Sequence, residues 1–104
     1  MYNDSETKAL AAAGAVEDPV DKGWRKKFDS ARFKFSHSGG FARCSVHVGD
    51  VAASIESRKG LEGLVDSVLE KMESGFIPTW KLGDDVRPWL EALKEEVCRQ
   101  QPSA

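Results

Sequence analysis

Residues 32–56 read RFKFSHSGGFARCSVHVGDVAASIE, and this stretch decides the fold. Apolar and polar side chains alternate along it, as they do in strands with one buried face. The alternation falls into three runs, 32–36, 41–48 and 51–56. Gly39-Gly40 and Gly49-Asp50 separate the runs, and glycine supplies the positive φ that a tight hairpin turn requires. The stretch therefore predicts three antiparallel strands joined by two hairpins.

The length of each loop sets the register of the strands, and a one-residue slip turns every side chain of a strand to the other face. Agreement of the apolar faces across the strands therefore tests each loop length. With two-residue loops, apolar meets apolar in five pairs, Phe35–Cys44, Phe33–Val46, Val48–Val51, Val46–Ala53 and Cys44–Ile55. On the other face Arg43 meets Glu56 as an opposite-charge pair. A three-residue first loop would instead place phenylalanine opposite serine. The competing interpretation, a helix from Asp50 onward, would carry Gly60 and Gly63 in its interior at about 1 kcal/mol each.

From residue 61 the hydrophobic period changes from two to that of a helix. The apolar positions of this helix are Leu61, Leu64, Val65, Val68, Leu69 and Met72. Ser57 is the expected N-cap and Gly75 the stop signal. A second helix is predicted from Val86 to about Arg99, with the buried stripe Val86, Leu90, Leu93 and Val97.

These elements predict an α+β fold, in which a three-stranded antiparallel β-meander has one face covered by an amphipathic helix and is followed by a second, C-terminal helix. We expect residues 1–21 to be a flexible acidic segment, at most loosely docked, in which Ser5 to Ala13 form a frayed helix. Residues 22–100 are the predicted single domain, opening with a basic lead-in at residues 22–30 that forms a helical turn or a loop. Residues 101–104 are a tail.

The composition is that of one small globular domain of 104 residues. The net charge of −2 is unevenly spread, since residues 22–59 hold nine basic and three acidic side chains between two acidic blocks. Such a block marks either an anionic partner or a basic sheet that pairs with its own acidic helices. Two isolated cysteines, no apolar run of membrane length and no signal-peptide pattern predict a cytoplasmic protein without a membrane partner.

No pattern in the sequence predicts catalysis, a metal site or a cofactor. By the register above, Cys44 lies on the inner face of the sheet and His47 on the outer face, so the two cannot form a nucleophilic dyad. Asp84-Asp85 is the tightest acidic pair, and the start of a helix accounts for it. We therefore expect a non-enzymatic protein with no cofactor.

Two surfaces remain as candidate binding sites. The outer sheet face is basic and made mostly of small residues, and with the lead-in it offers Arg32, Lys34, Arg43, His47, Lys26 and Lys27 beside Trp24. It would suit a phosphate backbone or an acidic protein, although Phe41 is the one aromatic side chain placed to stack on a base. The second surface is the apolar loop 76–82, with Phe76 and Trp80. We expect this loop to be buried; exposed, it would form a protein-binding hot spot.

The sequence thus favours a small non-catalytic protein-binding module, such as an adaptor, an inhibitor or an immunity-type protein. The alternative is a nucleic-acid-binding protein that uses the basic sheet face. A third hypothesis is an enzyme subunit whose site a partner completes. Strands 32–36 and 51–56 are both predicted edges, so a homodimer could form through either.

Overall fold

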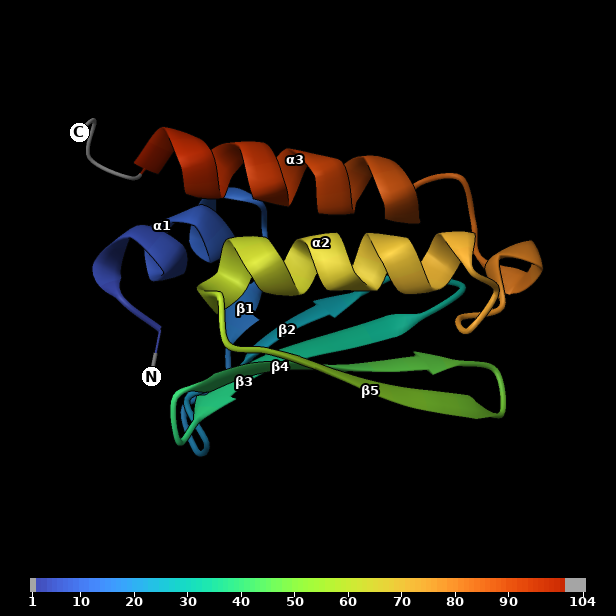
Figure 1. Ribbon diagram of the computed structural model, residues 1–104, viewed down its shortest axis with the longest axis horizontal. Helices are drawn as coiled ribbons and strands as arrows, with labels where there is room; N and C mark the ends of the chain where they lie inside the picture. Colours follow the sequence, from blue (N-terminus) through green and yellow to red (C-terminus); the bar gives the residue numbers. More distant parts are fainter. Residues whose placement is uncertain (1, 101–104) are drawn as a thin grey trace.

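The computed structural model describes residues 2–100 and has an α+β architecture with one antiparallel sheet (Figure 1). The strands lie in the order β1-β2-β3-β4-β5, and their bounds are β1 Val16–Glu17, β2 Trp24–Lys27, β3 Arg32–Ser38, β4 Phe41–Val48 and β5 Val51–Ser57. The helices are α1 Asp4–Ala12, α2 Gly60–Glu73, the short 3-10 helix η1 Thr79–Lys81 and α3 Val86–Gln100. The predicted tail, residues 101–104, lies outside the described residues.

The predicted register is confirmed at both hairpins. Phe35 pairs with Cys44 across β3 and β4, and Cys44 pairs with Ile55 across β4 and β5. Gly39 and Gly40 adopt φ of 59° and 83°, the left-handed values that a two-residue turn needs at both positions. The alternation of side chains therefore places Phe33, Phe35, Cys44 and Val46 together on one buried face.

The number of strands is larger than the predicted three, because the lead-in at residues 22–30 contains a fourth strand and Val16–Glu17 forms a fifth. In β2, Trp24 and Lys26 pair with the buried Phe35 and Phe33, so they share the inner face of the sheet. The run Arg25-Lys26-Lys27 conceals this alternation in the sequence. Lys26 is tolerated on the inner side because its ammonium lies 5.3 Å from the centre of the Phe28 ring, at the margin of the core.

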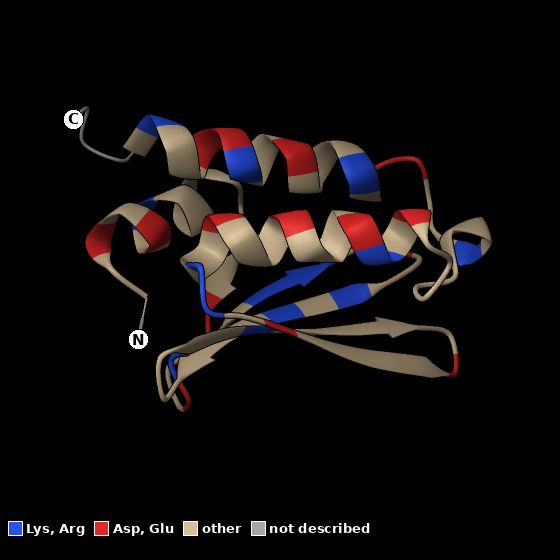
Figure 2. Ribbon diagram, viewed as in Figure 1, with Lys and Arg blue, Asp and Glu red and all other residues tan. Residues whose placement is uncertain are grey.

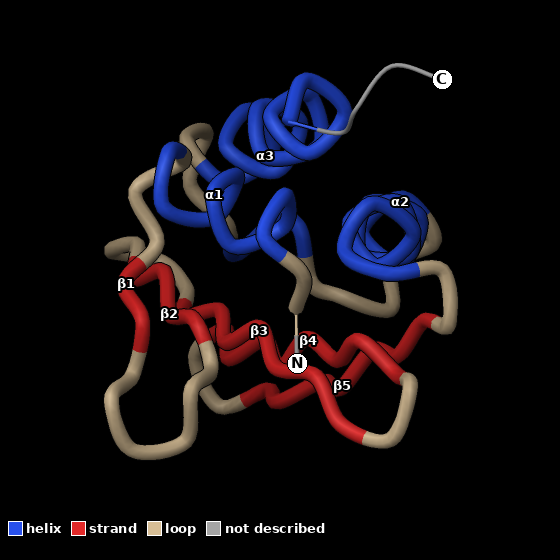
Figure 3. The backbone as a smooth tube through the Cα atoms, turned by 90° about the vertical axis from the view of Figure 1, so that its left-hand side faces the viewer, coloured by secondary structure: helices blue, strands red, loops and turns tan. Residues whose placement is uncertain are grey.

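The N-terminal helix packs against the domain more closely than the predicted loose docking. Helix α1 begins after a capping box in which Asn3, not Ser5, is the N-cap and Glu6 bonds back to the Asn3 amide. Ala9 and Leu10 of α1 are fully buried. Figure 3 shows α1 beside α3, and α3 holds it there because Trp89 Nε1 donates to the Ala13 carbonyl at 2.7 Å.

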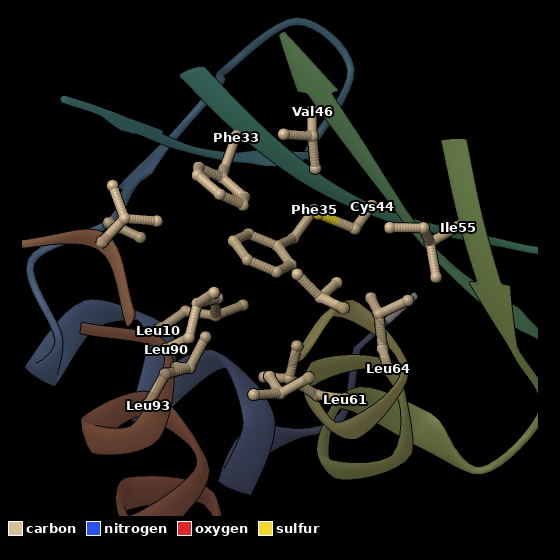
Figure 4. Packing of buried hydrophobic residues seen from close by; sticks show 14 of the residues in the cluster. Leu10, Phe33, Phe35, Cys44, Val46, Ile55, Leu61, Leu64, Leu90 and Leu93 are labelled. Carbon is tan, nitrogen blue, oxygen red and sulfur yellow. The ribbon is translucent and has the colours of Figure 1, made fainter. Parts of the chain in front are cut away.

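The helices α1, α2 and α3 lie on one side of the sheet and leave its other face open (Figures 1 and 3). Between the layers lies one apolar core, in which the aromatic rings of the sheet meet leucines from all three helices (Figure 4). Both predicted helical stripes are buried, α2 through Leu61, Leu64, Val65, Val68 and Met72, and α3 through Val86, Leu90, Leu93 and Val97. Among residues 2–100, every helix falls short of the length and apolarity that crossing a bilayer requires.

Helix α2 begins with an unusual cap. Its N-cap residue is Lys59, which provides no side-chain hydrogen bond, and the predicted cap Ser57 instead accepts from the Lys59 amide. The amide of Leu61 is satisfied by Glu6 of α1, whose Oε2 accepts at 2.6 Å from 55 residues away. Helix α1 therefore supplies the cap that the local sequence of α2 lacks.

Candidate interaction surfaces

The open face of the sheet carries the predicted basic surface. Figure 2 shows Lys and Arg gathered on β2 and β3, while bands of Asp and Glu recur along the helices. The pairing places Arg25 beside Lys34 and Lys27 beside Arg32, all on the open face. Arg25 adds to the predicted surface, because the basic run of residues 25–27 conceals the alternation that assigns it to this face.

Two basic residues and a histidine of this face form one row across the sheet, Lys27, Arg32 and His47. Successive strands of a sheet lie about 4.8 Å apart, so these side chains are close neighbours. Within residues 2–100, none of the three enters an ion pair or a side-chain hydrogen bond. They contribute, with Arg25 and Lys34, to the lining of a shallow hollow of about 420 Å³.

The other cations of the face are neutralised by acidic residues. Arg25 lies 2.7 Å from Asp18, Arg43 lies 2.8 Å from Glu56, and Lys34 pairs with Asp21. The hydrogen bond from Lys34 lowers the pKa of Asp21 below its usual value, so this carboxylate stays charged at neutral pH. The positive potential of the face is therefore concentrated at Lys27 and Arg32, with His47 beside them, and Lys34 and Arg43 add less than the sequence implied.

Two further residues of the predicted surface have other partners. Lys26 is half-buried on the inner side of β2, so it does not share the face of Lys27 and Arg32. Phe41 does lie on the open side, but the Arg58 guanidinium is 4.8 Å from its ring centre. A base could stack on Phe41 only after Arg58 moved away.

The loop between α2 and α3 is more exposed than predicted. Trp80 is 75% exposed and Phe76 is 56% exposed, whereas Ile77 between α2 and η1 is fully buried. The Ile77 side chain is thus the part of the loop that closes the core. The expectation that the whole loop is buried was wrong, and its two aromatic side chains face solvent.

Several hydrogen bonds brace the backbone of this loop. The Ile77 amide donates to the Lys71 carbonyl at 3.1 Å, and the Lys81 and Leu82 amides close the turn of η1 at 3.0 Å each. The Gly83 amide donates to Ser30 Oγ at 2.8 Å, which ties the loop to the β2–β3 turn. Trp80 is therefore presented by a fixed turn, next to a hollow of about 520 Å³ whose lining includes Thr79, Leu82, Arg87 and Pro88.

The nucleophilic side chains are poorly placed for chemistry. Burial raises the pKa of the Cys44 thiol well above its usual value. Desolvation, followed by the charge of Glu62, raises the pKa of Cys98. Both thiols therefore stay protonated at neutral pH, which is the less reactive form. In the part of the chain that the structure describes, no three His, Cys, Asp or Glu side chains cluster as a metal site would need.

Comparison of the chain with protein-family models, with curated proteins and with solved structures yields no match. The two surfaces are therefore interpreted from their own residues. One is a hydrogen-bonded loop that exposes two aromatic side chains, and the other is the row Lys27–Arg32–His47 on an open sheet face.

Proposed function

We propose that the protein is a small non-catalytic protein-binding module, of the adaptor, inhibitor or immunity type, and that Trp80 is its anchor. The observation that carries the proposal is the 75% exposure of Trp80 on a loop whose neighbours Ile77 and Pro78 are buried. Tryptophan is the residue most enriched at binding hot spots, where it fills a pocket of the partner and loses its contact with water.

A loop that is already ordered supports this assignment, because less conformational entropy is lost when a partner binds. Ordering a mobile side chain at an interface costs about 0.5–1.5 kcal/mol, and a mobile loop costs more. The hydrogen bonds of residues 77–83 fix the backbone before any partner arrives. The Lys71 ammonium lies 5.3 Å from the centre of the Phe76 ring, so this second aromatic side chain is partly shielded. Trp80 therefore has the dominant role.

The test is a binding comparison between Trp80→Ala and a matched control, Val20→Ala. Val20 is 90% exposed on the β1–β2 turn, so the control also removes an exposed apolar side chain. The wild-type chain and both variants are used to capture partners from lysates of the cells that make the protein, and the captured protein is then purified and titrated. A hot-spot residue contributes about 2 kcal/mol or more, so Trp80→Ala should weaken binding roughly 30-fold.

The control should bind like the wild type, and the affinity should change little with salt because the anchor is apolar. Equal affinity of Trp80→Ala and the wild type for the purified partner would contradict the proposal. So would a capture pattern that is the same for all three chains.

The second candidate function is nucleic-acid binding, and the row Lys27–Arg32–His47 favours it because neither of its two cations, Lys27 and Arg32, has an acidic partner within residues 2–100. Fluorescence anisotropy with single-stranded, double-stranded and RNA probes, at low and physiological salt, tests this function. On duplex DNA, log affinity falls against log salt with a slope of about −0.9 per phosphate neutralised. The variant Lys27→Ala/Arg32→Ala should weaken the slope by about 2, whereas Arg43→Ala, which removes a paired cation, should change it little. No binding at low salt, or equal effects of both variants, would exclude this site.

A further inference from the structure

The two edges of the sheet are very different. Strand β1 has two residues, and a short edge strand offers little backbone to another chain. Strand β5 has seven residues, Val51–Ser57, and among residues 2–100 it pairs with β4 alone. It contains no proline and no lysine, the residues that commonly protect an exposed edge, and Glu56 is held by Arg43. In Figure 1 the turn before β5 lies away from α1, α2 and α3.

The register shows which backbone groups of β5 are unpaired. In a two-residue hairpin the residues that flank the loop form a hydrogen-bonded pair, and here they are Val48 and Val51. Every second residue after Val51 therefore bonds to β4. The N–H and C=O groups of Ala52, Ser54 and Glu56 point away from it, and none of them takes part in another backbone hydrogen bond within residues 2–100.

We propose that β5 pairs with β5 of a second copy of this chain, antiparallel and in the register centred on Ser54. This register brings all three open residues into hydrogen-bonded pairs, Ser54 with Ser54 and Ala52 with Glu56 in both directions. A shift of two residues either way would carry part of each ladder beyond the strand. The result is a continuous ten-stranded sheet built from two five-stranded sheets.

The charges at the ends of the strand agree with the same register. Counting outward from Ser54, Asp50 of one copy lies opposite Arg58 of the other, and the twofold axis repeats this pair. Opposite charges facing each other across strands stabilise pairing. Glu56 lies directly opposite Ala52, so no two like charges face each other across the seam. The edge is thus complementary to itself in charge as well as in hydrogen bonding.

The side chains on the helix side of β5 also gain contacts. In this register Ala53 of one copy lies opposite Ile55 of the other as a non-hydrogen-bonded pair, the closer kind of cross-strand neighbour. Ala53 is half-buried and Val51 is 38% exposed, so apolar surface is available at the seam. The twofold axis runs perpendicular to the sheet, and it therefore keeps both basic faces on one side of the dimer.

Disulfide trapping tests the register. Each cysteine variant is made in a Cys98→Ser chain, because Cys98 is exposed and Cys44 is buried. In a hydrogen-bonded antiparallel pair the Cα atoms are about 5.5 Å apart, within the range that a disulfide spans. Ser54→Cys should therefore become a disulfide-linked dimer under mild oxidation.

Ala52→Cys is the matched control, because residue 52 lies opposite residue 56 and roughly 14 Å from its own copy. Alone it should stay monomeric on a non-reducing gel, and so should Glu56→Cys. A mixture of the two should cross-link. Ala52→Cys that cross-links as readily as Ser54→Cys would overturn the register.

The dimer itself is tested by light scattering on the unmodified chain over a range of protein concentrations. Asp50→Lys and Arg58→Glu should each weaken the dimer roughly tenfold by turning two attractive pairs into repulsive ones, and the double variant should recover most of the loss. Ser54→Pro removes an N–H at the open edge only, so it should abolish the dimer while far-UV circular dichroism stays that of the folded chain. A wild-type chain that is monomeric at high micromolar concentration overturns the proposal.

Discussion

Replacing Glu6 by Gln should destabilise the protein by about 2–3 kcal/mol, although the change is nearly isosteric. Glu6 is buried, and its two carboxylate oxygens accept from two backbone amides, Asn3 at 3.0 Å and Leu61 at 2.6 Å. An amide side chain has one acceptor oxygen, and its NH₂ group would face the second amide donor. One charge-assisted bond, of about 1.5–3 kcal/mol, is therefore lost, and a buried donor is left without a partner.

The position of this carboxylate sets the size of the effect. Leu61 is fully buried in the first turn of α2, so water cannot replace the lost acceptor. A negative charge at a helix N-terminus also interacts favourably with the helix dipole, by about 0.3–1 kcal/mol. Because Lys59 provides no cap, nothing local compensates. Glu6→Ala removes both bonds and leaves a cavity, so its cost should be larger still, about 4 kcal/mol.

Urea unfolding followed by tryptophan fluorescence and circular dichroism measures both values. Glu70→Gln is the control, because Glu70 is an exposed residue of α2 without an ion pair among those of residues 2–100, and it should stay within about 0.5 kcal/mol of the wild type. A Glu6→Gln variant as stable as this control would refute the role of Glu6 as the cap of α2.

Three further predictions concern the same packing. Gly60→Ala should lower the free energy of unfolding by about 2 kcal/mol, because Gly60 has φ of 76° and an added Cβ would lie 2.8 Å from Glu6 Oε2. The cost should be smaller in the Glu6→Ala background, and unfolding of the double variant measures this coupling. Trp89→Phe should cost about 1–3 kcal/mol by the same assay, since it removes the 2.7 Å bond to the Ala13 carbonyl. Burial raises the pKa of Tyr2, so its contribution is intact below about pH 10 and is lost as the pH rises further. Above pH 10 the free energy of unfolding of the wild type should therefore fall as the pH rises. In Tyr2→Phe it should fall less steeply, by up to about 1.4 kcal/mol per pH unit.

The central meander could be predicted from the sequence because its information is local. A period of two and glycine at both loops leave one register in which faces agree, and that register is present from Arg32↔His47 to Val48↔Val51. The two helical stripes are equally local. Strand β2 could not be predicted in the same way, because its inward position 26 holds a basic side chain. Contacts of the Lys26 ammonium with the rings of Phe28 and Trp89 make this position acceptable.

Docking of the N-terminal segment depends on contacts that no local pattern contains. The spacing of Asn3 and Glu6 fits a capping box, although Ser5 is the N-cap that the sequence predicts. The bond from Glu6 to Leu61 spans 55 residues. Likewise, the apolar composition of residues 76–82 cannot say which side chain turns inward. Burial of Ile77 decides it, and Trp80 consequently faces solvent.

The two additional strands, β1 and β2, also determine which edge of the sheet is available for self-association. A three-stranded meander would have had two long edges, and nothing in the sequence distinguished strand 32–36 from strand 51–56. Strand β2 covers the first of these edges, and β1 ends the sheet on that side after two residues. The unpaired backbone of the sheet is thereby concentrated on β5, where Asp50 and Arg58 are equally spaced from Ser54. An edge that is long, unprotected and complementary to itself favours a second copy over an unrelated strand, because an unrelated strand would have to match both charges by chance.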